Sequence, residues 1–222
     1  MKKATVVFLV LAMFSATDYG NTKQPEASAP KDETAYLQLM PMLKWEDLSE
    51  GQKELYVKGF LETFSFFVYG MSKRDQESAQ YFSDWTACTM GEPAKRWIGV
   101  MSDWLFGDLK ATAASQLWKT SGIVCQKYRG KGNKQWKPVQ LVSSDEWTNL
   151  SPENKEIYAT SYIETEDVAN HKAKQDATIE HLESCMKNGG EKRFLDAVKT
   201  IPVERQNPLP WSISKALGIA CW

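Results

Sequence analysis

Two glutamates are the polar residues whose placement most suggests a chemical role. Glu62 and Glu164 occupy the same place in two similar stretches, "WEDLSEGQKELYVKGFLET" from Trp45 and "WTNLSPENKEIYATSYIET" from Trp147. A carboxyl group among aromatic residues could be a buried acid, and two carboxyl groups could form the acid–base pair of a glycosidase. The simpler interpretation is that Glu62 pairs with Lys58, one turn earlier on a helix. We therefore predict structural roles for both glutamates and no catalytic residue.

The two histidines, His171 and His181, are the other candidates for catalysis or metal binding. On one helix they would lie too far apart to bind the same ion. His181 lies one turn before Cys185, which we expect to be in a disulfide. No Ser-His-Asp or Cys-His set recurs in both stretches, and no glycine-rich phosphate loop is present. We predict surface or packing roles for both histidines, no metal site and no cofactor.

The four cysteines indicate that the similarity extends beyond the two stretches. Cys88 and Cys125 are separated by nearly the same distance in sequence as Cys185 and Cys221, and the closing phrases "SGIVC" and "LGIAC" are alike. Similar runs, "KRWI" and "KRFL", follow the first cysteine of each pair. Equivalent pairing, Cys88–Cys125 and Cys185–Cys221, is therefore favoured, and each bridge should contribute about 3–4 kcal/mol. A four-cysteine metal site is the rival, but it lacks a close pair of cysteines.

The stretch "QKYRGKGNKQWKPVQ" lies between the two similar regions and mixes basic with aromatic residues. It is either a solvated linker or a docking loop for an acidic protein partner or an anionic glycan. A formal net charge of -1 gives the chain no general attraction to nucleic acid. The predicted partner-binding residues are Lys127, Tyr128, Arg129, Lys131, Lys134, Trp136 and Lys137.

Helices must position these residues, because apolar and aromatic positions follow helical spacing and no sustained alternation predicts a sheet. Ser49 and Ser151 are natural N-caps, and Pro152 suits the first position of a helix. Trp45 and Trp147 precede the caps, so we expect both rings to fold back over the first turn. The expected helices lie near residues 50–69, 74–88, 92–106, 109–122, 152–170, 173–187, 190–200 and 210–219.

Aromatic residues are concentrated in the first of the two similar regions. Among the nine tryptophans of the chain, Trp85, Trp97, Trp104 and Trp118 lie there together with Phe106. We expect most of these rings to form the core, since a surface excess would indicate a binding face.

The chain begins with two lysines and a short apolar run, which is typical of a secretory signal and too short for a stable membrane span. An uncleaved anchor or a buried strand is the alternative. No later stretch is apolar enough to span a membrane, and we expect a periplasmic or secreted location. The expected organisation is a signal peptide (1–20), a flexible linker (21–35), helical unit 1 (36–126), a basic inter-unit linker (127–143) and helical unit 2 (144–222).

The combination of "YVKGFLE", Cys88, "RWIGVMSDWL" and a last helix closing on "GIVC" resembles the Rap1a/Tai-type immunity proteins. The resemblance covers each unit from its first helix to its last cysteine. It implies a small, helical, disulfide-containing periplasmic protein that neutralises a secreted peptidoglycan amidase.

We accordingly predict an all-α protein of two tandem, homologous, disulfide-braced units that acts through protein–protein contact without catalysis. The leading expectation is neutralisation of a secreted cell-wall-degrading toxin. The alternative is a structural or accessory subunit of an envelope assembly, and an enzyme acting on cell-wall carbohydrate is a third class. The sequence identifies neither the partner nor the oligomeric state.

Overall fold

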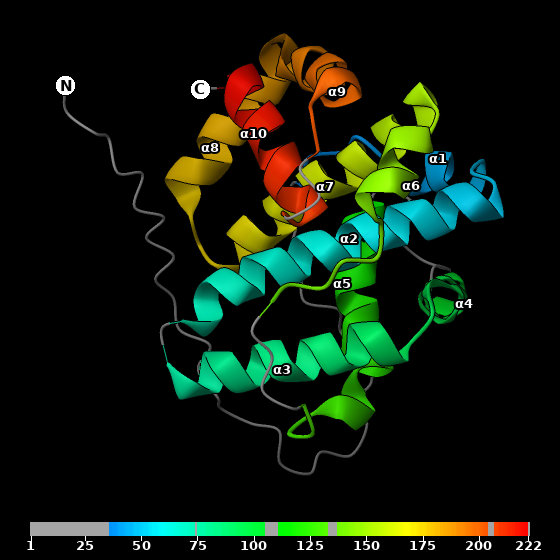
Figure 1. Ribbon diagram of the computed structural model, residues 1–222, viewed down its shortest axis with the longest axis vertical. Coiled ribbons are helices and arrows are strands. Elements are labelled where there is room, and N and C mark those ends of the chain that lie inside the picture. Colours follow the sequence, from blue (N-terminus) through cyan, green and yellow to red (C-terminus); the bar gives the residue numbers. More distant parts are fainter. Residues whose placement is uncertain (1–35, 74, 105–110, 133–136, 204–206, 222) are drawn as a thin grey trace.

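The computed structural model describes residues 36–73, 75–104, 111–132, 137–203 and 207–221, and these form an all-α fold (Figure 1). Over these ranges there is no β-strand, and Pro41 and Thr112 form an isolated β-bridge. The helices are α1 (Met42–Glu46), α2 (Glu50–Ser72), α3 (Gln76–Gly91), α4 (Ala94–Trp104), α5 (Ala113–Val124), η1 (Gln126–Tyr128), α6 (Ser144–Asn149), α7 (Pro152–Lys172), α8 (Asp176–Cys185), η2 (Met186–Gly190), α9 (Glu191–Thr200) and α10 (Leu209–Cys221). We call α1 to α5 the first half and α6 to α10 the second half.

The predicted helix starts are confirmed at α2 and α7. The Ser49 hydroxyl accepts the backbone N–H of Gln52 at 3.3 Å, and the Gln52 side chain accepts the N–H of Ser49 at 3.0 Å. Ser151 accepts the N–H of Asn154 at 3.2 Å, and Pro152 fills the first helical position. Each cap satisfies a donor that the helix itself leaves free, so both helices begin where the local sequence dictates.

Two short helices were not expected, and they carry the tryptophans that precede these caps. Trp45 in α1 and Trp147 in α6 are both buried. Each ring makes an edge contact with a tyrosine of the long helix that follows, Tyr56 or Tyr158, with ring centroids 5.5 Å apart in both cases. The predicted folding back of the two rings therefore takes the form of a separate helical turn.

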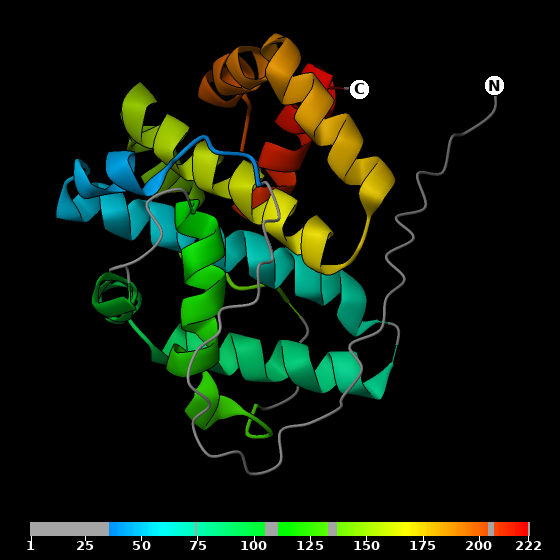
Figure 2. The same cartoon turned by 180° about the vertical axis from the view of Figure 1, so that it is seen from behind.

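The long helices α2 and α7 run side by side in the same direction through the middle of the molecule (Figures 1 and 2). Where Gly59 faces α7, a Cβ on Gly59 would lie 3.1 Å from the Cβ of Ser161, so small residues permit the contact. The Ser161 hydroxyl also donates to the Tyr56 carbonyl oxygen at 2.7 Å. Because each helix is covered on several sides, each is buried over most of its length rather than amphipathic.

Helices on two opposite sides of this central pair complete most of the fold. Figure 1 shows α8, α9 and α10 at one end, α3 and η1 at the other, and α2 and α7 between them. In the first half, the rings of Trp85 and Trp118 contact Phe64 with centroid distances of 4.5 and 4.7 Å. Trp97 is fully buried, so these tryptophans belong to the core, as predicted. The side chains of Trp104 and Phe106 lie outside the described residues.

Both predicted disulfides are present. Cys88–Cys125 joins the end of α3 to the end of α5, with Cα atoms 5.3 Å apart. Cys185–Cys221 joins the end of α8 to the end of α10, with Cα atoms 5.6 Å apart. Disulfides persist in oxidising surroundings, which suggests an extracytoplasmic environment.

The expected signal peptide (1–20) and flexible linker (21–35) lie outside the described residues. None of the helices in the described part of the chain is both long and apolar enough to cross a membrane.

Candidate functional site

Glu62, one of the two candidate acids, is completely buried on α2. One carboxylate oxygen accepts the backbone N–H groups of Leu141 and Val142, the second at 2.5 Å. The other oxygen accepts the hydroxyl of Tyr158, which comes from α7. The predicted pairing with Lys58 is wrong, because Lys58 instead forms an ion pair with Glu146 at 3.2 Å. Glu62 therefore serves as an acceptor for donors from the second half and from the segment that precedes it.

Glu164, the other candidate acid, makes the same set of contacts with the roles of the halves exchanged. It is buried on α7, and one of its oxygens accepts the N–H groups of Leu39 and Met40 at 2.8 and 2.6 Å. Its other oxygen accepts the hydroxyl of Tyr56 on α2. The two glutamates thus hold donors from opposite halves of the molecule.

A third matched contact lies one turn further along each helix. The N–H of Leu37 donates to Asp167 on α7 at 2.9 Å, and the N–H of Val139 donates to Ser65 on α2 at 2.9 Å. We call residues 36–41 the first leading segment and residues 137–143 the second leading segment. Each leading segment therefore binds the long helix of the other half, and this exchange ties the halves together.

This arrangement favours a structural role for both carboxylates. A catalytic acid needs an oxygen that reaches the substrate. Glu62 and Glu164 are 0% and 1% exposed, and each already accepts three hydrogen bonds. Buried polar groups that are fully paired specify packing rather than reactivity.

Burial also changes the acidity of the two glutamates. It raises the pKa of Glu62 from an ordinary value of 4.5 to about 7, although the Tyr158 hydroxyl and two backbone N–H groups oppose the rise. Burial raises the pKa of Glu164 to about 8 against the same kind of opposing contacts. The proton therefore binds more tightly to each carboxyl in the folded protein than in the unfolded chain.

We predict that the protein becomes less stable as pH rises from about 5 to above 8. A raised folded-state pKa contributes stability that is complete below the unfolded pKa and is lost as pH passes the folded pKa. For Glu62 the loss amounts to about 3 kcal/mol, since one pKa unit corresponds to about 1.4 kcal/mol. Burial raises the pKa of Glu166 and of Asp167 as well, so these carboxyls act in the same direction.

Urea unfolding at pH 5 and pH 8.5 measures this loss. The Glu62→Gln variant, which cannot ionise at this position, should show a flatter dependence than the parent protein. A stability that rises across this interval, or a variant with the parent's full dependence, would contradict the assignment.

The basic stretch predicted to bind a partner is fixed to α3 at its start. The Tyr128 hydroxyl donates to Glu92 at 2.9 Å, and the Lys127 ammonium lies 2.5 Å from the same carboxylate. Asp84 then accepts the backbone N–H groups of Gly130 and Gly132 at 2.6 and 2.8 Å. We call residues 126–132 the anchored loop.

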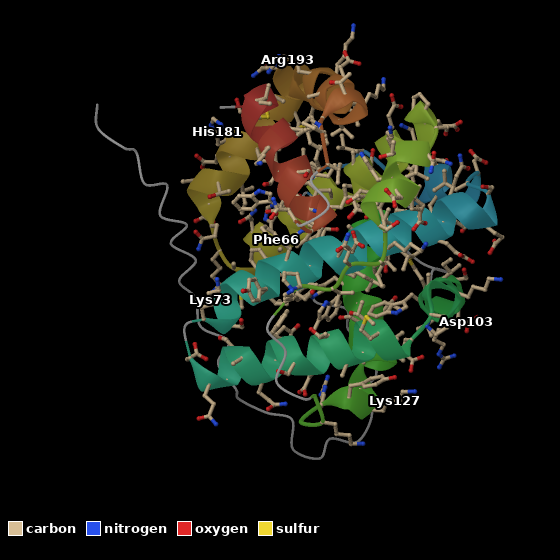
Figure 3. The ribbon with its side chains drawn as sticks, viewed as in Figure 1. Phe66, Lys73, Asp103, Lys127, His181 and Arg193 are labelled. Carbon is tan, nitrogen blue, oxygen red and sulfur yellow. A yellow bond between two sulfur atoms is a disulfide. The ribbon has the colours of Figure 1, made fainter. Side chains whose placement is uncertain are left out.

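The cationic side chains of this region face solvent. Lys127, Arg129, Lys131 and Lys137 are all exposed, and Figure 3 shows Lys127 at the opposite end of the molecule from Arg193. Lys134 and Trp136, also predicted to bind a partner, lie outside the described residues.

The histidines occupy different surroundings, both in the second half. The His181 ring nitrogen Nε2 donates a hydrogen bond to the carbonyl oxygen of Cys221 at 3.0 Å. His171 lies between two carboxylates, Asp167 on its own helix and Glu183 on α8. In the described part of the chain, these three side chains are the set that could hold a metal ion. The signal in the sequence is an aspartate one helical turn before His171, rather than a second histidine.

A polar hollow of about 410 Å³ lies where the first turns of α2 and α7 meet. Its side chains include no histidine, cysteine or tyrosine, and it contains neither buried glutamate. The lining residues are Ser49, Gly51, Gln52, Glu54, Leu55, Lys58, Glu146, Leu150, Ser151, Glu153 and Asn154.

No family model matches this chain, and neither the curated proteins nor the solved structures contain a match to it.

Proposed function

We propose that the chain is an exported, non-catalytic binding protein built from two homologous units in tandem. The two sets of buried contacts support the duplication. Tyr158 and Glu164 follow Tyr56 and Glu62 by the same number of residues, and the two disulfides have nearly equal sequence separations of 37 and 36. A duplicated unit that pairs with its own copy would produce each contact twice in this reciprocal form.

The absence of catalysis is part of this proposal. The acids retained in both copies are used inside the fold, and the polar hollow is lined by short hydroxyls, amides and charged side chains without a nucleophile–base pair. Neither location offers the positioned groups that acid–base or nucleophilic chemistry requires.

The observation that carries a binding role is the anchored loop. A stretch with this composition would ordinarily be mobile, yet Glu92 and Asp84 hold its backbone and its tyrosine against α3. Its cationic side chains are left exposed. A fixed surface loses less conformational entropy on binding, and its positive charge favours an acidic partner.

The function that these features support best is neutralisation of a secreted cell-wall-degrading toxin. The resemblance to Rap1a/Tai-type immunity proteins points to this class, and a rigid disulfide-braced surface suits the blocking of an enzyme cleft. A periplasmic or secreted location follows from the same proposal and agrees with the two disulfides.

A structural or accessory subunit of an envelope assembly is the second candidate, and the exposed face of α10 favours it. Trp211 is 43% exposed and Ile219 is 76% exposed, about two helical turns apart. Permanent subunit contacts use apolar anchors of this kind more than charged loops. Genes for envelope assembly beside this gene would favour this candidate, whereas a neighbouring toxin gene would favour the first.

The binding role is tested by replacing Lys131, Lys134 and Lys137 together by Ala. Lys127 is left in place because it pairs with Glu92 and so helps to hold the loop. Binding to a partner captured from periplasmic extract should become slower and less dependent on salt, because the lysines steer association. Trp136→Ala should instead speed dissociation, since an aromatic anchor acts on the bound state.

The matched control replaces Lys44, Lys119 and Lys192, which are exposed on other helices and carry the same total charge. Surface plasmon resonance should separate the two triple variants by association rate, with unchanged melting temperatures. If the triple-lysine variant and Trp136→Ala both bind like the parent protein, the interface lies elsewhere and the proposed role of this basic stretch is wrong.

A further inference from the structure

The side chains of Asp167, His171 and Glu183 converge at the junction of α7 and α8. His171 Nε2 lies 3.6 Å from Asp167 Oδ1 and 3.8 Å from Glu183 Oε1. Both separations exceed a hydrogen bond, so the three atoms face one another across a small gap. All three candidate ligand atoms lie within 4.8 Å of one another.

The second observation is that two of these atoms are buried without a hydrogen-bond partner. Asp167 Oδ1 and His171 Nε2 are inaccessible to solvent, and neither forms a hydrogen bond. The Asp167 side chain is 0% exposed. A carboxylate oxygen in such a position costs free energy unless a cation or a donor occupies the space that it faces.

The outer contacts fix the orientation of both carboxylates. The N–H of Leu37 donates to Asp167 Oδ2 at 2.9 Å, and Lys187 donates to Glu183 Oε2 at 3.0 Å. Each carboxylate therefore has one oxygen held from outside and the other turned toward His171. Donors that hydrogen-bond to the outer oxygen of a ligating carboxylate orient the ligands of metal sites.

We propose that Asp167, His171 and Glu183 form a binding site for a divalent transition-metal ion of the zinc class. One imidazole and two carboxylates suit zinc, whereas magnesium and calcium prefer oxygen ligands alone. Two ligand atoms on one tetrahedral zinc ion lie roughly 3.4 Å apart, given bonds of about 2.0–2.2 Å. The distances from His171 Nε2 to Asp167 Oδ1 and to Glu183 Oε1, 3.6 and 3.8 Å, need only a small contraction to reach that value, and the two carboxylates, whose ligand atoms lie within 4.8 Å of each other, must also move together.

The three protein side chains account for three of the four positions around a tetrahedral ion. Two of the ligand atoms are buried, while the side chains of His171 and Glu183 are 17% and 24% exposed overall. Three protein ligands with an open fourth position contrast with the closed four-ligand sites that only stabilise a fold. The two carboxylate charges would balance the charge of the ion.

The first half provides an internal comparison that separates metal binding from folding. Ser65 on α2 takes the place that Asp167 takes on α7, and it still accepts an N–H of a leading segment at 2.9 Å. The leading segment therefore needs an acceptor but not a carboxylate. Asp167→Ser should consequently fold while losing a metal ligand.

Calorimetric titration of the chelator-treated full chain with zinc chloride tests the proposal. We expect one ion per chain with micromolar affinity or tighter, no comparable binding of magnesium, and a higher melting temperature with zinc. Asp167→Ser and His171→Gln should weaken zinc binding by about a hundredfold or more, and Glu183→Gln should also weaken it. Cobalt bound at the site should show a visible absorption band that these variants lose.

Two controls use neighbouring residues outside the site. Glu180→Gln changes an exposed carboxylate on α8, and His181→Gln changes the other histidine. Both should bind zinc like the parent protein. The proposal is overturned if the parent binds no zinc, or if well-folded Asp167→Ser or Glu183→Gln binds it with the parent's affinity.

Discussion

Replacing Glu164 by Ala should destabilise the protein by about 4 kcal/mol or more, enough to reduce the yield of folded protein. The change leaves the N–H groups of Leu39 and Met40 and the hydroxyl of Tyr56 without their acceptor inside the protein. Each buried donor left unpaired costs about 1–3 kcal/mol, and the lost side chain adds a cavity. Glu62→Ala should have an effect of similar size because Glu62 also accepts hydrogen bonds from two backbone N–H groups and one tyrosine hydroxyl.

Urea unfolding followed by circular dichroism measures the change, with Glu50→Ala as the control. Glu50 is an exposed residue in the first turn of α2, so its removal should alter the free energy of unfolding by only about 0.5 kcal/mol. The free energy of unfolding of Glu164→Gln should lie between those of the two alanine variants, since the amide oxygen can still accept both N–H groups. Equal stabilities for Glu164→Ala and Glu50→Ala would show that the buried contacts contribute little.

Removing either disulfide should cost about 3–4 kcal/mol, the second of the two largest effects. The bridges close loops of 37 and 36 residues, and the unfolded chain gains entropy when either loop is opened. For a protein of this size the melting temperature should fall by roughly 10 °C per bridge. The variants are Cys88→Ala with Cys125→Ala, and Cys185→Ala with Cys221→Ala.

Differential scanning calorimetry of the two double variants provides the measurement. Because the loops have nearly equal lengths, the two variants should melt at similar temperatures. Reducing agent should lower the melting temperature of the parent protein by about the sum of the decreases seen in the two variants. A double variant with the same melting temperature as the parent protein would mean that its bridge does not stabilise the fold.

The parts of the fold that the sequence predicts are those with local or repeated signals. Ser49 and Ser151 mark helix starts because a cap bonds to a residue three positions away. The disulfide pairing follows from equivalent cysteines in two similar regions. The all-α class follows from the helical spacing of apolar residues, because in this protein tertiary contacts do not change the secondary structure that this spacing favours.

The exchange of leading segments could not be predicted, because backbone groups carry it. Glu62 and Glu164 bind N–H groups that every residue except proline possesses, so no residue type identifies the partner. Asp84 anchors the loop in the same way, through Gly130 and Gly132. For the proposed metal site, Asp167 and His171 share a helix and are visible in the sequence, but Glu183 is supplied by a different helix.

We propose that buried tyrosine–glutamate contacts join the two halves and that function lies at the surface. A double-mutant cycle with Tyr56→Phe and Glu164→Gln tests it most directly, because the two residues come from opposite halves. The free energies of unfolding of the single and double variants should reveal a coupling of about 1–3 kcal/mol. Effects that simply add, with no coupling beyond experimental error, would contradict the claim.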